Sequence, residues 1–419
     1  MSLSRALGWA TAQTMARIAA GFFSAKISAL FLGPSGVALV GQVGNFIQLT
    51  QSVVCNGANT AIVNLSAQRS DTAARRDLWS TAIQLVLFVG LLLVLIVAVL
   101  SLPLASWLLS NRGYWPVMIA AALATIPIVV ESVIQGALNG LKRIDLLGKA
   151  AVISTVLEAV LFAALVFTFG IWGGLFGISA IYLVKLGVTC AAAFLSGAVR
   201  VSDLVGGFNP RTAREITAFY PMLIAHSIAQ PLAQIGVRSL VIERLSLDQA
   251  GYLQAAWRLS DMYMSVLTAS LGMYFMAHYS GLATAADRTS ILRKTVFQVF
   301  VLVSLAATTI YLLRELIVTI VLTRQFMPMT ALLPLQLLGD VSRIAGYPMQ
   351  MALVAERRTP WFIAVAVSGP AVFVSLSALW LSDHQSQAAP MAYASSQLLV
   401  LLILVFALRR TLIGKTSEF

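Results

Sequence analysis

Long apolar segments recur from one end of the chain to the other, and each is close to the roughly 20 residues that an α-helix needs to cross a bilayer. Only 11% of the residues are charged, whereas a soluble globular chain carries about 25%. Since only helices and closed barrels satisfy their backbone polar groups in hydrocarbon, we predict an all-α membrane protein. We count twelve segments, which cover approximately residues 5–32, 37–66, 79–109, 115–140, 150–169, 173–196, 214–241, 250–278, 295–322, 330–354, 360–381 and 390–408.

The basic residues are sorted between alternate connecting segments. One set of segments holds only Arg112, Arg244 and Arg324. The other set, which includes both chain ends, holds eighteen: Arg5, Arg69, Arg75, Arg76, Lys142, Arg143, Lys149, Arg200, Arg211, Arg214, Arg288, Arg293, Lys294, Arg357, Arg358, Arg409, Arg410 and Lys415. The positive-inside rule therefore predicts a multi-pass protein of the bacterial inner membrane with both termini in the cytoplasm. Because the net charge of +12 is distributed in this way, we expect no nucleic-acid partner.

The two halves of the chain resemble each other at a constant offset of 215 residues. This shift places 42–45 on 257–260 and 135–138 on 350–353. Six segments per half is an even number, so both halves enter the membrane from the same side and form a parallel repeat. We expect two six-helix bundles, over residues 1–200 and 214–419, joined by a cytoplasmic linker at 201–213. Such a repeat is typical of transporters that work by alternating access.

No part of the chain indicates an enzyme. The connecting segments are too short for a soluble catalytic domain, and no Walker-type phosphate loop is present. The three histidines, His226, His278 and His384, show no metal-ligand spacing with cysteines or carboxylates. We therefore expect no catalytic residue, no cofactor and no metal.

Twelve charged residues fall well inside the apolar segments, although a charge at mid-membrane costs about 3 kcal/mol. Such residues normally face the bundle interior or a water-filled cavity. The excess of bases favours an anionic substrate, while structural pairing between helices explains part of the set equally well. The bases are Arg17, Lys26, Lys185, Arg238, Arg258, Arg314 and Arg343, and the acids are Glu131, Glu158, Asp261, Glu315 and Asp340.

The first segment carries two of these bases on opposite faces. At 100° per residue, Arg17 shares one face with Gln13, Ser24 and Ser28. Lys26 points to the other side, where it reaches the interface or pairs elsewhere. Arg17 is therefore the stronger candidate for a substrate contact.

The second segment carries a stripe of amides without charge. Amides donate and accept hydrogen bonds, as sugar hydroxyls do. The alternative is that these side chains hold helices together, which polar groups in membranes commonly do. The stripe consists of Gln42, Asn45, Gln48, Asn56 and Asn59.

Two further segments carry charges one helical turn apart. Arg258 and Asp261 are so placed in the eighth segment, and Asp340 and Arg343 in the tenth, where they can form an ion pair. These positions are candidates for ion coupling or gating. His226 is a candidate for titration during transport, although a buried, hydrogen-bonded histidine is the more ordinary interpretation.

Several short motifs resemble those of the Wzx-type lipid-linked oligosaccharide flippases, and most closely the enterobacterial common antigen lipid III translocases. The resemblance spans nearly the whole chain. The residues that carry it are Gly33-Pro34-Ser35-Gly36, Gly44-Asn45-Phe46, Leu259-Ser260-Asp261, Tyr311-Leu312-Leu313-Arg314-Glu315 and Gln336-Leu337-Leu338-Gly339-Asp340-Val341.

The resemblance implies a V of two six-helix bundles, as in the multidrug/oligosaccharidyl-lipid/polysaccharide exporter superfamily, with helices 1, 2, 7 and 8 lining a central cavity. It implies that an undecaprenyl-diphosphate-linked oligosaccharide moves to the periplasmic leaflet, driven by an ion gradient. The partners would be this lipid-linked oligosaccharide, the bilayer, and polysaccharide polymerase and chain-length machinery. Arg258 stands where the lipid III pattern has a small polar residue, so the glycan is expected to differ from the common-antigen trisaccharide.

On this interpretation the bases hold the diphosphate, with Arg17, Arg238 and Arg258 ahead of Lys26, and the amide stripe contacts the glycan. Protonation of Asp261 and Asp340 would release their basic partners. One alternative is a cation-coupled multidrug exporter, for which we expect an acid in the first segment. Another is an O-antigen polymerase or ligase, which needs a large periplasmic loop.

Overall fold

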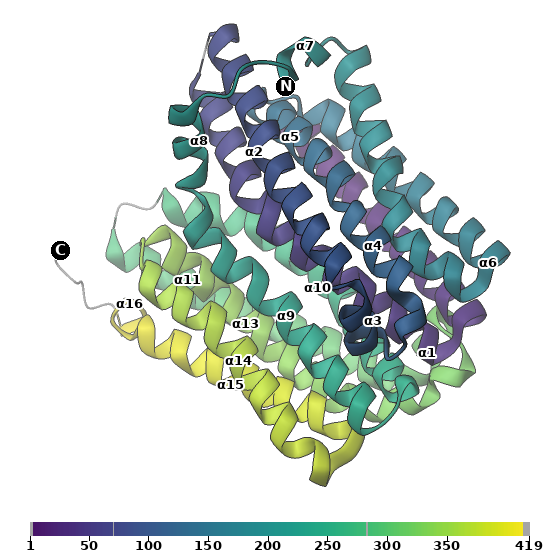
Figure 1. Ribbon diagram of the computed structural model, residues 1–419. Helices are drawn as coiled ribbons and strands as arrows, with labels where there is room; N and C mark the ends of the chain where they lie inside the picture. The colour runs from purple at the N-terminus through teal and green to yellow at the C-terminus, as the bar shows by residue number, and fades with distance from the viewer. Residues whose placement is uncertain (1–2, 70, 282–283, 414–419) are drawn as a thin grey trace. The chain divides into compact units, whose positions relative to one another are not determined.

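The computed structural model describes residues 3–69, 71–281 and 284–413, and every regular element in those ranges is a helix (Figure 1). The chain divides into two compact units, Met1–Ile235 and Gly236–Phe419. The long helix α9 (Tyr220–Arg244) contains the division.

The first unit consists of the elements that precede α9 and the first part of α9 itself. These elements are α1 (Leu3–Gln68), α2 (Thr72–Val99), α3 (Ser101–Leu109), η1 (Arg112–Tyr114), α4 (Trp115–Leu123), α5 (Thr125–Gly140), α6 (Ile144–Leu195), α7 (Val201–Leu204) and α8 (Pro210–Thr217). Within this unit α1, α5 and α6 pack against one another, and α2 packs against α5.

The second unit consists of the rest of α9 and the elements that follow it. These elements are α10 (Leu247–Ser280), α11 (Ala285–Leu312), α12 (Arg314–Val321), η2 (Arg324–Ala331), α13 (Leu333–Ala355), α14 (Thr359–His384), η3 (Gln385–Gln387), α15 (Ala388–Ala407) and α16 (Arg409–Ile413). Helix α13 packs against α10, α11 and α15, and its buried residues Met349 and Leu353 share one apolar core with Phe275 and Leu404.

All twelve predicted segments are largely helical, but they do not correspond one to one with the helices of the structure. Helix α1 contains the first two segments and α6 contains the fifth and sixth, each interrupted at a single glycine. Gly33 has φ 64° and ψ −173°, a positive-φ conformation that glycine adopts at no steric cost. Pro34 follows and lies in the first turn of the second part of α1, a position that suits proline.

Six stretches of the described chain are long and apolar enough to cross a membrane. Three of them, at Thr11–Gln68, Ile144–Leu195 and Thr359–Ala407, contain 58, 52 and 49 residues, enough for two crossings each. Helix α13, which is fully described, is not among the six, because Asp340 and Arg343 lower its hydropathy.

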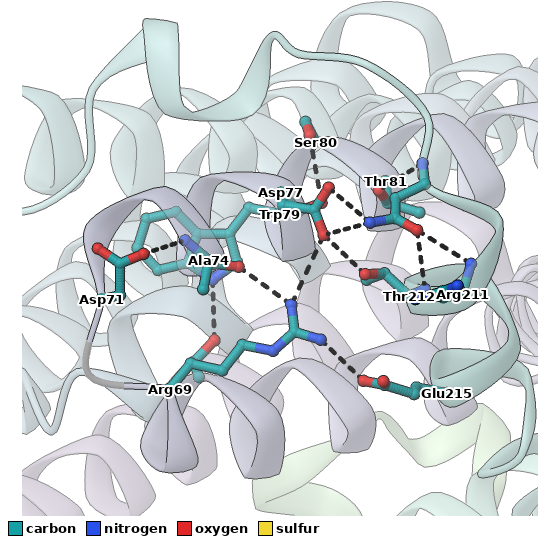
Figure 2. A network of polar contacts seen from close by, with 12 residues as sticks. Arg69, Asp71, Ala74, Asp77, Trp79, Ser80, Thr81, Arg211, Thr212 and Glu215 are labelled. Atoms are coloured by element: carbon teal, nitrogen blue, oxygen red, sulfur yellow. Dashed lines mark hydrogen bonds and ion pairs between the residues drawn. The ribbon is translucent and has the colours of Figure 1, made fainter.

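The linker between the predicted bundles is fixed to the first unit by a polar network (Figure 2). We call residues 200–215 the linker strap. Asp77 of α2 is its centre: Thr212 Oγ1 donates to Asp77 Oδ2 at 2.7 Å, and Asn209 Nδ2 donates to both carboxylate oxygens at 3.1 and 3.2 Å. Arg69 lies 3.8 Å from the same carboxylate and pairs with Glu215 at 2.7 Å.

Two further bonds attach the first part of the strap through its backbone. Gln84 Nε2 donates to the carbonyl of Gly206 at 2.8 Å, and Arg76 Nη2 donates to that of Val205 at 3.1 Å. These bonds explain why the strap groups with the first unit. The predicted bundle limits of 1–200 and 214–419 stay a prediction.

The beginning of α9 is attached to the first unit as well. Tyr220 OH donates to the carbonyl of Val54 at 2.7 Å, and the tyrosine ring lies over Gly57. A Cβ at position 57 would stand 2.4 Å from that ring, so the close approach requires glycine.

Replacing Asp77 with alanine should loosen the strap. The carboxylate accepts charge-assisted bonds worth about 1.5 kcal/mol or more each, which corresponds to roughly tenfold in a local opening equilibrium. Hydrogen exchange of a peptide covering 200–215, measured by mass spectrometry in nanodiscs, should therefore accelerate about tenfold. Glu215→Gln removes only a half-exposed ion pair and should exchange at close to the wild-type rate. Equal exchange in D77A and wild type would contradict the assignment of Asp77 as the centre of the network.

Candidate functional site

The two bases of α1 differ in their exposure. Arg17 is exposed, whereas Lys26 is half-buried and already engaged with other groups of the protein. Arg17 is within electrostatic range of Glu158 on α6. Its guanidinium is therefore the more accessible of the two charges.

The amide stripe of α1 divides into engaged and available side chains. Asn45 Nδ2 donates to Gln234 Oε1 at 3.0 Å, and Asn59 Nδ2 donates to the carbonyl of Ser132 at 3.0 Å. Gln42 is fully buried and also engaged. Asn45 and Asn59 therefore hold helices together, which is the alternative that the sequence left open.

The remaining two amides differ from these three. Gln48 is exposed and Asn56 is half-buried, and neither side chain has a hydrogen bond to any other described residue. They are the members of the stripe whose amides are available to a ligand.

An ion pair lies inside the first unit. Lys185 Nζ of α6 is 3.3 Å from Glu131 Oε2 of α5, and Thr189 Oγ1 donates to Glu131 Oε1 at 3.4 Å. The sequence indicated these charges but gave no distance between them, because they lie more than fifty positions apart.

Arg238, a predicted diphosphate ligand, is completely buried. Its guanidinium lies 5.2 Å from the centre of the Trp257 ring and donates to Gln254 Oε1. A cation over an aromatic face and an amide acceptor together stabilise a buried charge. Because the side chain is completely buried, direct contact with a substrate would require a rearrangement that exposes it.

Asp340 of α13 is the most fully bonded carboxylate in the second unit. Ser260 Oγ and Tyr263 OH donate to its Oδ2 at 2.5 and 2.6 Å, and Tyr393 OH and Gln336 Nε2 donate to its Oδ1 at 2.9 and 3.3 Å. All four donors are neutral. They come from α10, α13 and α15 and therefore connect three helices through one carboxylate.

The predicted ion pair of Asp340 with Arg343 is not formed. The ion pairs among the described residues do not include it. The four neutral donors occupy the carboxylate, and Arg343 hydrogen-bonds to Tyr393 instead, within electrostatic range of both Asp340 and Asp261. This part of the prediction is wrong, although the two residues do belong to one cluster.

Arg258 and Asp261 also form no direct pair. Arg258 is half-buried, Asp261 is exposed, and neither side chain has a hydrogen bond or ion pair to another described residue. The side chain of His226 lies outside the described residues, so its predicted role stays a prediction.

Sequence reasoning missed the neutral partners of the charged groups. Trp257, Tyr263 and Tyr393 were not singled out, because a tyrosine or tryptophan in an apolar helix ordinarily indicates packing or an interface position. The spacing of Ser260 and Tyr263 on the face of α10 toward α13 was a signal that could have identified two of the four donors to Asp340.

Comparison with known proteins identifies relatives of the whole chain. The sequence model of a family described as polysaccharide biosynthesis protein matches residues 27–331. The lipid III flippase of Escherichia coli (strain K12) is 24% identical over 399 residues, covering 94% of this chain and 95% of that protein. The lipid III flippase of Shigella flexneri matches with the same identity and coverage.

Solved structures share the fold at low sequence identity. A multidrug resistance MATE family transporter of the MOP superfamily, in an inward-facing conformation, aligns with a TM-score of 0.75 and 14% identity over 97% of this chain and 96% of that one. The lipid II flippase MurJ, in an inward closed conformation, aligns with a TM-score of 0.77 and 13% identity over 96% and 87%. The predicted all-α membrane transporter fold is confirmed.

Replacing Tyr393 with phenylalanine should destabilise the second unit, because it removes one hydrogen-bond donor to a buried carboxylate and keeps the ring. A hydrogen bond to a charged group contributes about 1.5–3 kcal/mol, and the free energy of unfolding in mixed micelles should fall by that amount. Tyr347, on α13, makes no such bond to a described residue, and Tyr347→Phe should change the free energy by less than about 0.5 kcal/mol. Equal effects of the two substitutions would show that the Asp340 cluster does not hold the unit together.

Proposed function

The chain belongs to the polysaccharide biosynthesis protein family, and from this membership we propose that it is a flippase for an undecaprenyl-diphosphate-linked oligosaccharide. The substrate would move from the cytoplasmic to the periplasmic leaflet by alternating access. The observation that carries this proposal is the match to lipid III flippases along 94% of the chain, on a transporter fold. A transporter of this kind is not an enzyme, because it moves its substrate without changing a covalent bond.

The charges of the site support an anionic headgroup. Arg17 is exposed, and half-buried Arg258 has no ion pair to a described residue. A guanidinium matches a phosphate with two parallel hydrogen bonds, and the bonds are strong because both partners are charged. In the first unit we assign the diphosphate to Arg17, with Lys26 in a supporting role; Arg258 and the buried Arg238 are the candidate ligands of the second unit.

The glycan would meet the available amides of α1. Gln48 and Asn56 have free donors and acceptors, which suit sugar hydroxyls. Asn45 and Asn59 are hydrogen-bonded within the first unit, and Gln42 is buried, so these three are assigned to the structure of the unit.

Ion coupling in the second unit would involve Asp261 rather than Asp340. Four neutral donors already satisfy the Asp340 carboxylate, whereas Asp261 is accessible and lies within electrostatic range of Arg343. Protonation of Asp261 would remove one of the two negative charges that act on Arg343 and leave Asp340 as the other, which gives the cluster two charge states.

The chain is a multi-pass membrane protein, and we place it in the bacterial inner membrane with both termini in the cytoplasm, on the distribution of its basic residues. Polysaccharide polymerase and chain-length machinery are the partners that this position suggests. A multidrug exporter has the same fold, but the first segment holds two bases and no acid, which favours an anionic cargo over a cationic drug.

Arg17→Ala should reduce transport sharply. Loss of a charge-assisted bond to phosphate costs about 1.5–3 kcal/mol, which corresponds to a rate decrease of roughly ten- to a hundredfold. The assay follows a fluorescent undecaprenyl-diphosphate-linked oligosaccharide across liposome leaflets. Arg112→Ala, an exposed arginine outside the site, should leave the rate unchanged. Wild-type rates in a correctly folded R17A protein would overturn the assignment.

Gln48→Ala should weaken binding of the same lipid-linked sugar without affecting folding. One neutral hydrogen bond contributes about 1 kcal/mol, so the apparent Kd should rise about fivefold. Asn59→Ala is the matched comparison: its amide bonds to Ser132, and its loss should lower thermal stability rather than affinity. If Asn59→Ala weakened binding and Gln48→Ala lowered only stability, the assignment of the amide stripe to the glycan would be wrong.

A further inference from the structure

The first unit contains a charge cluster whose residues belong to no site assigned above, apart from Arg17. It draws on three helices that pack against one another, α1, α5 and α6. The charged groups are Glu131 of α5, Glu158 and Lys185 of α6, and Arg17 of α1. Tyr182 and Cys190 of α6 and Cys55 of α1 are the other described titratable groups that interact with it.

The two carboxylates of the cluster are bonded unequally. Glu131 is 4% exposed and has both oxygens engaged, one by Lys185 and one by Thr189. The Oε1 atom of Glu158 is buried, and no described residue donates a hydrogen bond to it. A buried anionic oxygen without a donor is costly, whereas the protonated acid is neutral and loses much of that penalty.

Lys185 and Arg17 are the two cations that act on Glu158. Lys185 is committed to Glu131 at 3.3 Å, which leaves the exposed Arg17 as the cation that remains uncommitted. Glu158 and the anionic substrate would therefore compete for the same guanidinium.

We propose that Glu158 is a proton-binding site whose occupancy is linked to binding of the substrate diphosphate at Arg17. A proton on Glu158 removes the competing negative charge and leaves Arg17 to attract the anion. By reciprocity, the bound diphosphate favours the protonated acid, so binding takes up a proton from solvent. The inference rests on the proposed function, because it takes Arg17 as the diphosphate ligand.

The sign of the pH dependence follows from the charges. With Glu158 ionised, the four charged side chains sum to zero; with Glu158 protonated, they sum to one positive charge. The apparent affinity for the lipid diphosphate should therefore strengthen as pH falls. Glu158→Gln is permanently neutral, so its affinity should be independent of pH and equal to the low-pH affinity of the wild type.

The test measures binding of an undecaprenyl-diphosphate-linked sugar to the full-length protein in nanodiscs across a pH series. This diester is chosen because its two phosphates keep their charges over the range. We expect the wild-type Kd to fall about fivefold or more on acidification, and E158Q to show no change. Asp145→Asn, which removes a surface carboxylate of the same helix, should keep the wild-type pH dependence.

Infrared difference spectroscopy provides a readout that does not depend on transport. Addition of the lipid should raise a carboxylic-acid C=O band in the wild type and in Asp145→Asn, and this band should be missing in E158Q. A pH dependence that persists unchanged in E158Q, or a substrate-induced band that survives the substitution, would overturn the inference. Absence of any binding by the wild type would overturn the proposed function instead, and a pH-titrating band of Glu158 without lipid would still establish the proton site.

Discussion

A charged side chain in a membrane-spanning helix is stable only when other groups of the protein replace the water that it has lost. The two units meet this requirement in different ways. In the second unit, Asp340 is surrounded by neutral donors and Arg238 by an aromatic ring and an amide. In the first unit, Glu131 is neutralised by a lysine. The neutral donors around Asp340 fix helices in place, whereas the charged groups around Glu131 remain sensitive to protonation.

This difference separates structural charges from functional ones. Arg238 and Asp340 are both fully buried, and each holds helices together: Arg238 joins α9 to α10, and Asp340 joins α10, α13 and α15. Three other charged residues of the long helices make no ion pair with a described residue: Arg17, Arg258 and Asp261. An anionic substrate would stabilise the charges of Arg17 and Arg258, and a proton would neutralise that of Asp261.

The helical fold could be predicted from the sequence because bilayer thickness and backbone hydrogen bonding leave few alternatives. Contacts between helices could not. Whether Asn45 meets a sugar or Gln234, and whether Asp340 meets Arg343 or two tyrosines, depends on residues distant in sequence whose approach no periodicity records.

The single-glycine turns at Gly33 and Gly170 have a consequence for biogenesis. Each joins two apolar segments with almost no connecting loop, and neither turn carries a charged residue. In the predicted orientation, these turns are the parts that must pass through the membrane during insertion. Each segment pair would therefore enter the membrane as a preformed hairpin. Little polar surface would have to cross the hydrocarbon, and closing so short a loop costs little entropy. Insertion of the first unit would then proceed by pairs of helices rather than one crossing at a time.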